Sequence, residues 1–167
     1  CSRYGRPLTD GQYSFPVPED LAKSDTDHLR LCSTGYRALY LSKTSGYLLE
    51  NPDFLTSLAS ISLKEARTEL IKLPGVGPKV ADCVLLFAYN HYQTVPVDVW
   101  IRSIITCGYP LVHTRSGEKK ECSYNDIVDF CRAYFGIYAG YAQQLLFAAR
   151  RDLPEIFPES SDSVKEM

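Results

Sequence analysis

The stretch LPGVGPK at residues 73–79 decides how this chain folds, and Asp98 follows its lysine nineteen residues later. Two glycines separated by one residue allow a tight turn, and a proline just after them suits the first turn of a helix, where its missing N–H needs no partner. The pattern therefore predicts a helix, a short hairpin and a second helix. The hairpin N–H groups and the positive end of the second helix suit a phosphate, although a tight turn without any ligand is the alternative.

Hydrophobic periodicity predicts that helices fill most of the chain. Ser62 with Glu65 three residues later forms a capping-box pattern, which marks the start of the helix before the hairpin. Residues 94–101 are β-branched, but Pro96 interrupts them, so we expect a loop that leads into a helix. The helices expected from the hairpin region onward are 63–73, 78–89, one starting at about 98, 124–135 and 139–151. Earlier helices are expected from about residue 18, with a break near 33–35.

Composition narrows the class of protein. The chain has 167 residues, 45% of them hydrophobic, and a formal net charge of −2, which argues against nonspecific coating of nucleic acid through bulk charge. No apolar run approaches the roughly 20 residues that span a membrane, so we expect no membrane association. The six cysteines form no C-x-x-C pair, and the three histidines show no metal-ligand spacing. We therefore expect reduced thiols and no zinc or iron–sulfur site.

With Lys79 and Asp98 in register, residues 73–105 resemble the helix-hairpin-helix DNA glycosylases, and most of all their 8-oxoguanine branch. The motifs GYRA at 35–38 and YAGYAQ at 138–143 extend the resemblance over roughly residues 1–150. It implies an all-α fold, with a helical catalytic domain over 1–155 that lacks the β-rich N-terminal domain of that branch. We expect residues 156–167 to be a disordered tail.

The same resemblance implies base excision repair of damaged double-stranded DNA by a monomer, in the cytoplasm or nucleoid of a prokaryote or the nucleus of a eukaryote. The expected activity is excision of 8-oxoguanine followed by cleavage of the abasic site. Two alternatives remain open: a glycosylase and lyase for another oxidised base, and a noncatalytic helix-hairpin-helix module that binds DNA.

Lys79 and Asp98 are the expected catalytic residues. An amine attacks C1′ of a deoxyribose only when it is neutral, and the positive end of a helix disfavours the ammonium form of a lysine in its first turn. We expect Lys79 to form a Schiff base with the sugar. Asp98 is expected to stabilise the cationic character that develops on the sugar as the base leaves. The alternative for Asp98, an N-cap of the helix that begins there, is compatible with this role.

A glycosylase flips its nucleotide out of the duplex and holds the base in a pocket. Cys83 and Phe87 lie four and eight residues beyond Lys79 and are expected to form one wall. By resemblance, Phe147 forms the opposite wall, and Gln143 binds the Watson–Crick edge of the base. The alternative for all four residues is ordinary packing in the core.

The resemblance also implies residues that contact DNA. Tyr36 resembles the residue that wedges the base stack open, and Arg37 resembles the one that reads the cytosine opposite the lesion. Trp100 stands where the 8-oxoguanine branch commonly has a histidine that contacts the lesion strand. The full set expected to contact DNA comprises Tyr36, Arg37, Gly75, Gly77, Val80 and Trp100.

No cofactor is expected to be required. The family binds a monovalent or divalent cation through carbonyl groups of the hairpin, and these correspond to Ile71, Leu73 and Val76. Carbonyl oxygens are ligands that suit hard cations. The four-cysteine iron–sulfur cluster of some relatives is not expected, because the cysteines lack its spacing.

Overall fold

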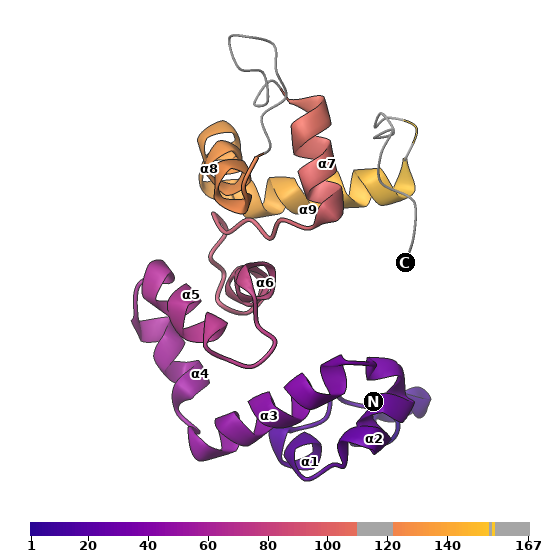
Figure 1. Cartoon of the computed structure of the whole chain (residues 1–167). Coiled ribbons are helices and arrows are strands. Elements are labelled where there is room, and N and C mark those ends of the chain that lie inside the picture. The colour runs from indigo at the N-terminus through magenta and orange to yellow at the C-terminus, as the bar shows by residue number, and fades with distance from the viewer. Residues whose placement is uncertain (110–121, 154, 156–167) are drawn as a thin grey trace. The chain divides into compact units, whose positions relative to one another are not determined.

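The computed structural model describes residues 1–109, 122–153 and 155, and the elements in these ranges are helical (Figure 1). The pairing of Pro7 with Tyr13 is an isolated bridge rather than a strand. The chain divides into two compact units, Cys1–Gly77 and Pro78–Met167, so the hairpin ends the first unit and the next helix begins the second. The single domain expected over residues 1–155 stays a prediction, and the tail expected over 156–167 lies outside the described residues. None of the described helices combines the length and the apolar character of a membrane span.

The first unit is built around one long helix. Its elements are η1 (Thr9–Gly11), α1 (Pro18–Ala22), α2 (Thr26–Leu29), η2 (Arg30–Thr34), α3 (Arg37–Glu50), α4 (Phe54–Ser57), η3 (Leu58–Ser60) and α5 (Leu63–Ile71). Helix α1 packs along α3, and Leu21, Leu29 and Ala38 form a buried cluster there. The predicted break near 33–35 is confirmed, because Ser33 has a φ of 61° and interrupts the helical backbone.

The predicted capping box starts α5. The Ser62 hydroxyl accepts a hydrogen bond from the Glu65 N–H, and the Glu65 carboxylate accepts one from the Ser62 N–H. Beyond α5, the hairpin rests on α3, because the Thr44 hydroxyl donates to the Pro74 carbonyl over 3.1 Å. A local cap and a distant side chain therefore fix the two ends of the segment that precedes the second unit.

In the second unit, α9 lies against two other helices. The elements are α6 (Pro78–Ala88), α7 (Val99–Gly108), α8 (Tyr124–Phe135), η5 (Gly136–Tyr138) and α9 (Ala139–Asp152). Helix α9 packs against both α7 and α8, as Figure 1 shows. The core between the three helices includes Ile101, Ile105, Ile127, Cys131 and Ala139, each at most 1% exposed.

Residues 89–98 join α6 to α7 as the predicted loop and not as a strand. The Gly140 N–H donates to the Tyr92 carbonyl over 2.7 Å, and a Cβ at Gly140 would overlap the Thr94 carbonyl and the Leu86 side chain. Helix α9 therefore crosses the loop at backbone contact, which a larger residue at position 140 would prevent. The loop is thus a fixed connection between Lys79 on α6 and Asp98 at the start of α7.

Candidate active site

Lys79 is the second residue of α6, and its side chain is exposed. Burial raises the pKa of the half-buried Cys83 thiol, the charge of Lys79 and a hydrogen bond with it lower that pKa, and the charges of Asp82 and Asp98 raise it again. The charges of Lys79, at the start of α6, and of Asp98, at the start of α7, thus both influence the Cys83 thiol. Since the net effect is a raised pKa, Cys83 stays a thiol near neutral pH, and a thiol is a poor nucleophile.

Asp98 is the N-cap of α7. Its Oδ1 accepts a hydrogen bond from the Ile101 N–H over 2.8 Å, and the residue is half-buried. The cap interpretation is thus confirmed, while the catalytic role stays a prediction. A carboxylate oriented by a cap on one oxygen can direct its other oxygen elsewhere, so the two roles remain compatible.

The expected base-pocket residues of α9 have other neighbours in this structure. Gln143 is only 3% exposed, and its Oε1 accepts a hydrogen bond from the Gln144 side chain over 2.6 Å. The ring of Phe147 stacks on Trp100, with 5.2 Å between centroids and 27° between planes. The structure therefore brings Phe147 together with Trp100, a pairing that the sequence did not predict.

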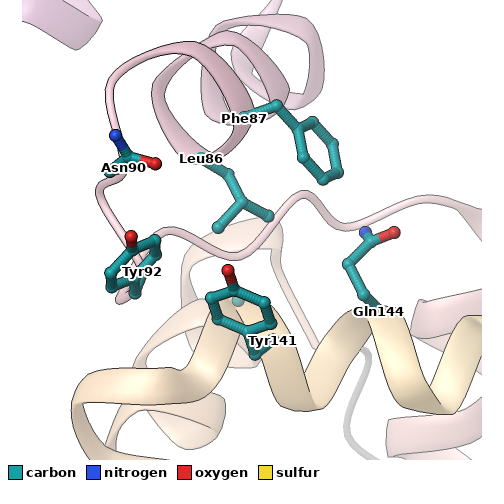
Figure 2. Close-up of a pocket in the computed structure, with 7 residues that line it drawn as sticks. Leu86, Phe87, Asn90, Tyr92, Tyr141 and Gln144 are labelled. Carbon is teal, nitrogen blue, oxygen red and sulfur yellow. The ribbon is translucent and has the colours of Figure 1, made fainter.

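Phe87 lines a depression of about 100 Å³ between α6 and α9 (Figure 2). Its walls are Leu86, Phe87, Asn90, Tyr92, Gly140, Tyr141 and Gln144. Phe87 is 61% exposed, and its neighbours from α9 in this depression are Tyr141 and Gln144 and not Gln143 or Phe147. The expected wall of Cys83 and Phe87 stays a prediction.

Two of the residues expected to contact DNA form one exposed group at the start of α3. Tyr36 is 69% exposed and precedes the helix, and the guanidinium carbon of Arg37 lies 4.7 Å from the centroid of its ring. Tyr40 meets the same ring edge-on at 6.3 Å. A cation over an aromatic face is an attractive pairing, and here it presents both side chains to solvent. In the other unit, Val80 on the first turn of α6 is 42% exposed.

The two hairpin glycines are required for different reasons. Gly75 has a φ of 78°, and a Cβ there would overlap the ring of Tyr40. The fold itself therefore demands glycine at position 75. A Cβ at Gly77 would meet no atom within 4 Å, so packing does not explain that glycine. Open space beside a glycine is what the close approach of a phosphate to the backbone needs.

The three carbonyls expected to bind a cation follow one another at the end of α5 and in the hairpin. The Leu73 carbonyl accepts the Val76 N–H over 3.1 Å, and a carbonyl oxygen has a second lone pair for a metal ion. Neutral carbonyl oxygens from Ile71, Leu73 and Val76 suit a hard cation, whether it is monovalent or divalent. The donor set is therefore suitable, and the site itself stays a prediction.

Sequence reasoning missed two residues that lie close in the chain or in space to the expected catalytic residues, Lys79 and Asp98. Asp82, three residues after Lys79, is 2% exposed, and its carboxylate accepts a hydrogen bond from the Tyr124 hydroxyl over 2.6 Å. One signal for Asp82 was present, because it is the only charge after Lys79 in the apolar stretch of α6. Tyr124 gave no such signal, since the two residues are 42 positions apart.

Comparison with known proteins bears on the hairpin and on the fold. Residues 66–87 match the helix-hairpin-helix motif. A probable N-glycosylase/DNA lyase of Methanothermobacter thermautotrophicus is 39% identical over 133 residues, which are 78% of this chain and 38% of that protein. The structure titled MBOgg1 in complex with a low-affinity DNA ligand has a TM-score of 0.80 at 33% identity, over 92% of this chain and 51% of that one.

A further solved structure is the 8-oxoguanine glycosylase/lyase of Clostridium acetobutylicum, in complex with double-stranded DNA containing cytosine opposite 8-oxoguanine. Its TM-score is 0.75 at 32% identity, over 90% of this chain and 50% of that one. The hairpin and the fold thus define a helix-hairpin-helix protein. More particularly, the chain belongs to the DNA glycosylases of that class, which confirms the predicted fold. It spans 38% to 51% of the length of these relatives.

Proposed function

We propose that the protein excises 8-oxoguanine from double-stranded DNA and then cleaves the abasic site by β-elimination, acting as a monomer in base excision repair. The observation that carries this proposal is that Lys79 lies in the first turn of α6, directly after the hairpin, while a cap to Ile101 orients the Asp98 carboxylate at the start of α7. An amine and an oriented carboxylate are the groups that attack on a deoxyribose requires. The similarity to an 8-oxoguanine glycosylase/lyase supports the choice of lesion.

In the proposed reaction, the neutral amine of Lys79 forms a bond to C1′ as the glycosidic bond breaks. The electron pair of that bond leaves with the base, which takes up a proton. Opening of the sugar ring gives the Schiff base between Lys79 and C1′, and loss of a C2′ proton then expels the 3′ phosphate. The carboxylate of Asp98, held by its cap to Ile101, stabilises the positive charge on the sugar.

The hairpin and the start of α3 are proposed to hold the DNA. The N–H groups around Gly75 and Gly77 contact a phosphate, which positions the backbone without reading its sequence. Val80, in the other unit, is proposed to contact DNA as well. Exposed Tyr36 wedges the stack open, and Arg37 reads the base opposite the lesion. The carbonyls of Ile71, Leu73 and Val76 would hold a cation, which would supply positive charge near the phosphate.

The test is covalent trapping with sodium borohydride, which reduces a Schiff base to a stable protein–DNA adduct. We expect the protein to form this adduct on duplexes that carry 8-oxoguanine opposite cytosine or an abasic site, and the Lys79→Gln variant to form none. Lys43→Gln is the matched control, because it removes the same charge from an exposed lysine outside the site.

An adduct of wild-type yield in Lys79→Gln would reject Lys79 as the nucleophile. Trapping on a duplex with an oxidised pyrimidine but not with 8-oxoguanine would show that the lesion is another oxidised base. Binding to all duplexes without trapping or base release would favour the noncatalytic module.

A further inference from the structure

The loop that carries Asp98 is fixed along its length by the helices that follow it. Helix α9 holds its beginning through Gly140 and Tyr92, as described above. Helix α8 holds its middle, because the Arg132 Nε donates to the Gln93 carbonyl over 2.9 Å. The loop ends at Asp98, so these contacts determine where the carboxylate lies relative to α6.

The third contact is made by the hydroxyl of Tyr124, the first residue of α8. It donates to Asp82 Oδ2 over 2.6 Å and accepts the Val97 N–H over 3.3 Å, with the Val95 carbonyl also at 3.3 Å. A hydroxyl has one donor and two acceptor sites, so it can satisfy partners on two elements at once. This single oxygen therefore joins α6, three residues after Lys79, to the residue just before Asp98.

Tyr124 is itself held firmly in place. The Ser123 hydroxyl accepts the Asp126 N–H over 3.2 Å, and the Asp126 carboxylate accepts the Ser123 N–H over 2.9 Å, so a complete capping box starts α8 at this point. Just before this box, the carbonyl of Cys122 accepts a hydrogen bond from Arg102 on α7. The backbone that carries the Tyr124 side chain is thus fixed, so its hydroxyl can position α6 and the loop before α7 relative to each other.

Burial strengthens the contact with Asp82. The Asp82 side chain is 2% exposed, and a hydrogen bond from a neutral hydroxyl to a carboxylate is stronger than one between neutral groups. Leaving a buried charge with fewer hydrogen bonds is costly, so the pair resists separation. The hydrogen bond between Tyr124 and Asp82 therefore fixes the distance between α6 and the loop, because breaking it would leave a buried carboxylate with fewer partners.

We propose that Tyr124 is a positioning residue for the reaction: its hydroxyl, shared by Asp82 and Val97, sets the placement of Asp98 relative to Lys79. This inference rests on the proposed function, because it concerns the same amine and carboxylate. Tyr124 touches neither the sugar nor the base in this arrangement. Its effect is on the rate of the chemical step and not on the binding of DNA.

The test compares Tyr124→Phe with the wild-type protein in single-turnover trapping on a duplex with 8-oxoguanine opposite cytosine. The variant keeps the ring and loses only the oxygen. We expect the trapping rate to fall about 10- to 100-fold, the loss associated with a misplacement of about 1 Å. The dissociation constant for a duplex with an unreactive abasic-site analogue should change less than about twofold, since no group that contacts DNA is altered.

Tyr134→Phe is the matched control, because it removes a hydroxyl from an exposed tyrosine of the same helix. Asp82→Asn is the conservative variant, since its amide oxygen still accepts the Tyr124 hydrogen bond. We expect the rate of Tyr134→Phe to equal that of wild type, and the rate of Asp82→Asn to lie closer to wild type than that of Tyr124→Phe. Thermal melts at the assay pH establish that each variant is folded.

Three results would overturn the proposal: a wild-type rate in Tyr124→Phe, equal losses of rate and DNA affinity in that variant, or a loss in Asp82→Asn as large as in Tyr124→Phe. Should Tyr124→Phe not fold, Asp82→Leu removes the same hydrogen bond by replacing its acceptor. We again expect the trapping rate to fall while the affinity for DNA stays unchanged. If the wild-type protein itself traps no DNA, the proposed function fails and this inference fails with it. Failure in the variants alone leaves the proposed function intact.

Discussion

At the scale of single residues, the hairpin shows how two similar glycines serve different ends. Gly75 combines a left-handed backbone with a ring of Tyr40 where its Cβ would lie, so the fold requires it. Gly77 has neither constraint. In the sequence LPGVGPK both glycines look like turn residues. Only the atoms around each one in the structure show that their roles differ.

We expect Gly75→Ala to destabilise the protein by about 2 kcal/mol, since a left-handed conformation alone costs an L-residue roughly 1–2 kcal/mol. Gly77→Ala should change the free energy of unfolding by less than about 0.5 kcal/mol, as is usual for a surface substitution without a clash. It should nevertheless weaken the binding of duplex DNA, because the new methyl group lies where the phosphate approaches. Chemical denaturation and fluorescence-anisotropy titration measure the two effects. Unchanged DNA affinity in a folded Gly77→Ala variant would reject the phosphate contact at this glycine.

At the scale of secondary-structure elements, the contact between α7 and α9 includes the stack of Trp100 on Phe147. Trp100 lies two residues after Asp98, and Phe147 is the residue expected to stack on the flipped base. A base that packs against Phe147 has to share this stack or replace it. Either outcome changes the surroundings of the indole, which is 42% exposed in this structure.

Trp100 is the chain's one tryptophan, so its emission reports on this stack alone. We expect a shift in its emission on binding a duplex that carries an unreactive 8-oxoguanine analogue, and a smaller shift with the undamaged duplex of the same sequence. The difference between the two shifts should disappear in Phe147→Ala, because this variant lacks the ring on which both the base and the indole are expected to stack. Identical shifts with both duplexes would place the flipped base away from Phe147.

At the scale of the whole molecule, the free energy of unfolding depends on pH through ionisable groups that folding buries. Cys131 lies 1% exposed in the core of α7, α8 and α9, and burial raises the pKa of its thiol to about 11. Burial also raises the pKa of Tyr89 and of Tyr109. Each of these groups favours the folded state only while it stays protonated.

This has a consequence for alkaline stability. The ordinary pKa of the thiol is 9.0, so above that pH the unfolded chain releases the Cys131 proton while the folded protein keeps it. The stabilisation is fully present below pH 9.0 and is lost as the pH rises to about 11. We expect the free energy of unfolding to fall across this window, and to fall less steeply in Cys131→Val. Denaturation curves at several pH values measure both slopes, and parallel slopes would show that Cys131 does not contribute.

The sequence predicted the elements well because their signals are local. The box of Ser62 and Glu65, the hairpin at 73–77 and the cap by Asp98 each depend on residues that are at most a few positions apart. The same reasoning separated the segment from residue 94 onward from a strand, through Pro96 and the helical spacing of Ile101, Ile104 and Ile105. Side-chain neighbours were not predicted from local signals: Phe87 shares a depression with Tyr141 and Gln144, and Phe147 stacks on Trp100, while the base pocket itself stays a prediction.

By itself, then, the sequence determined the helices from residue 63 onward, the caps by Ser62 and Asp98, the hairpin, and the presence of a lysine and an aspartate nineteen residues apart. These features follow from hydrogen bonds and periodicities within one or two turns of chain. Only the tertiary structure decided which groups surround the pair. The hydroxyl of Tyr124 reaches Asp82 across 42 positions and Val97 across 27, and such contacts depend on how helices pack against one another, which no local pattern encodes.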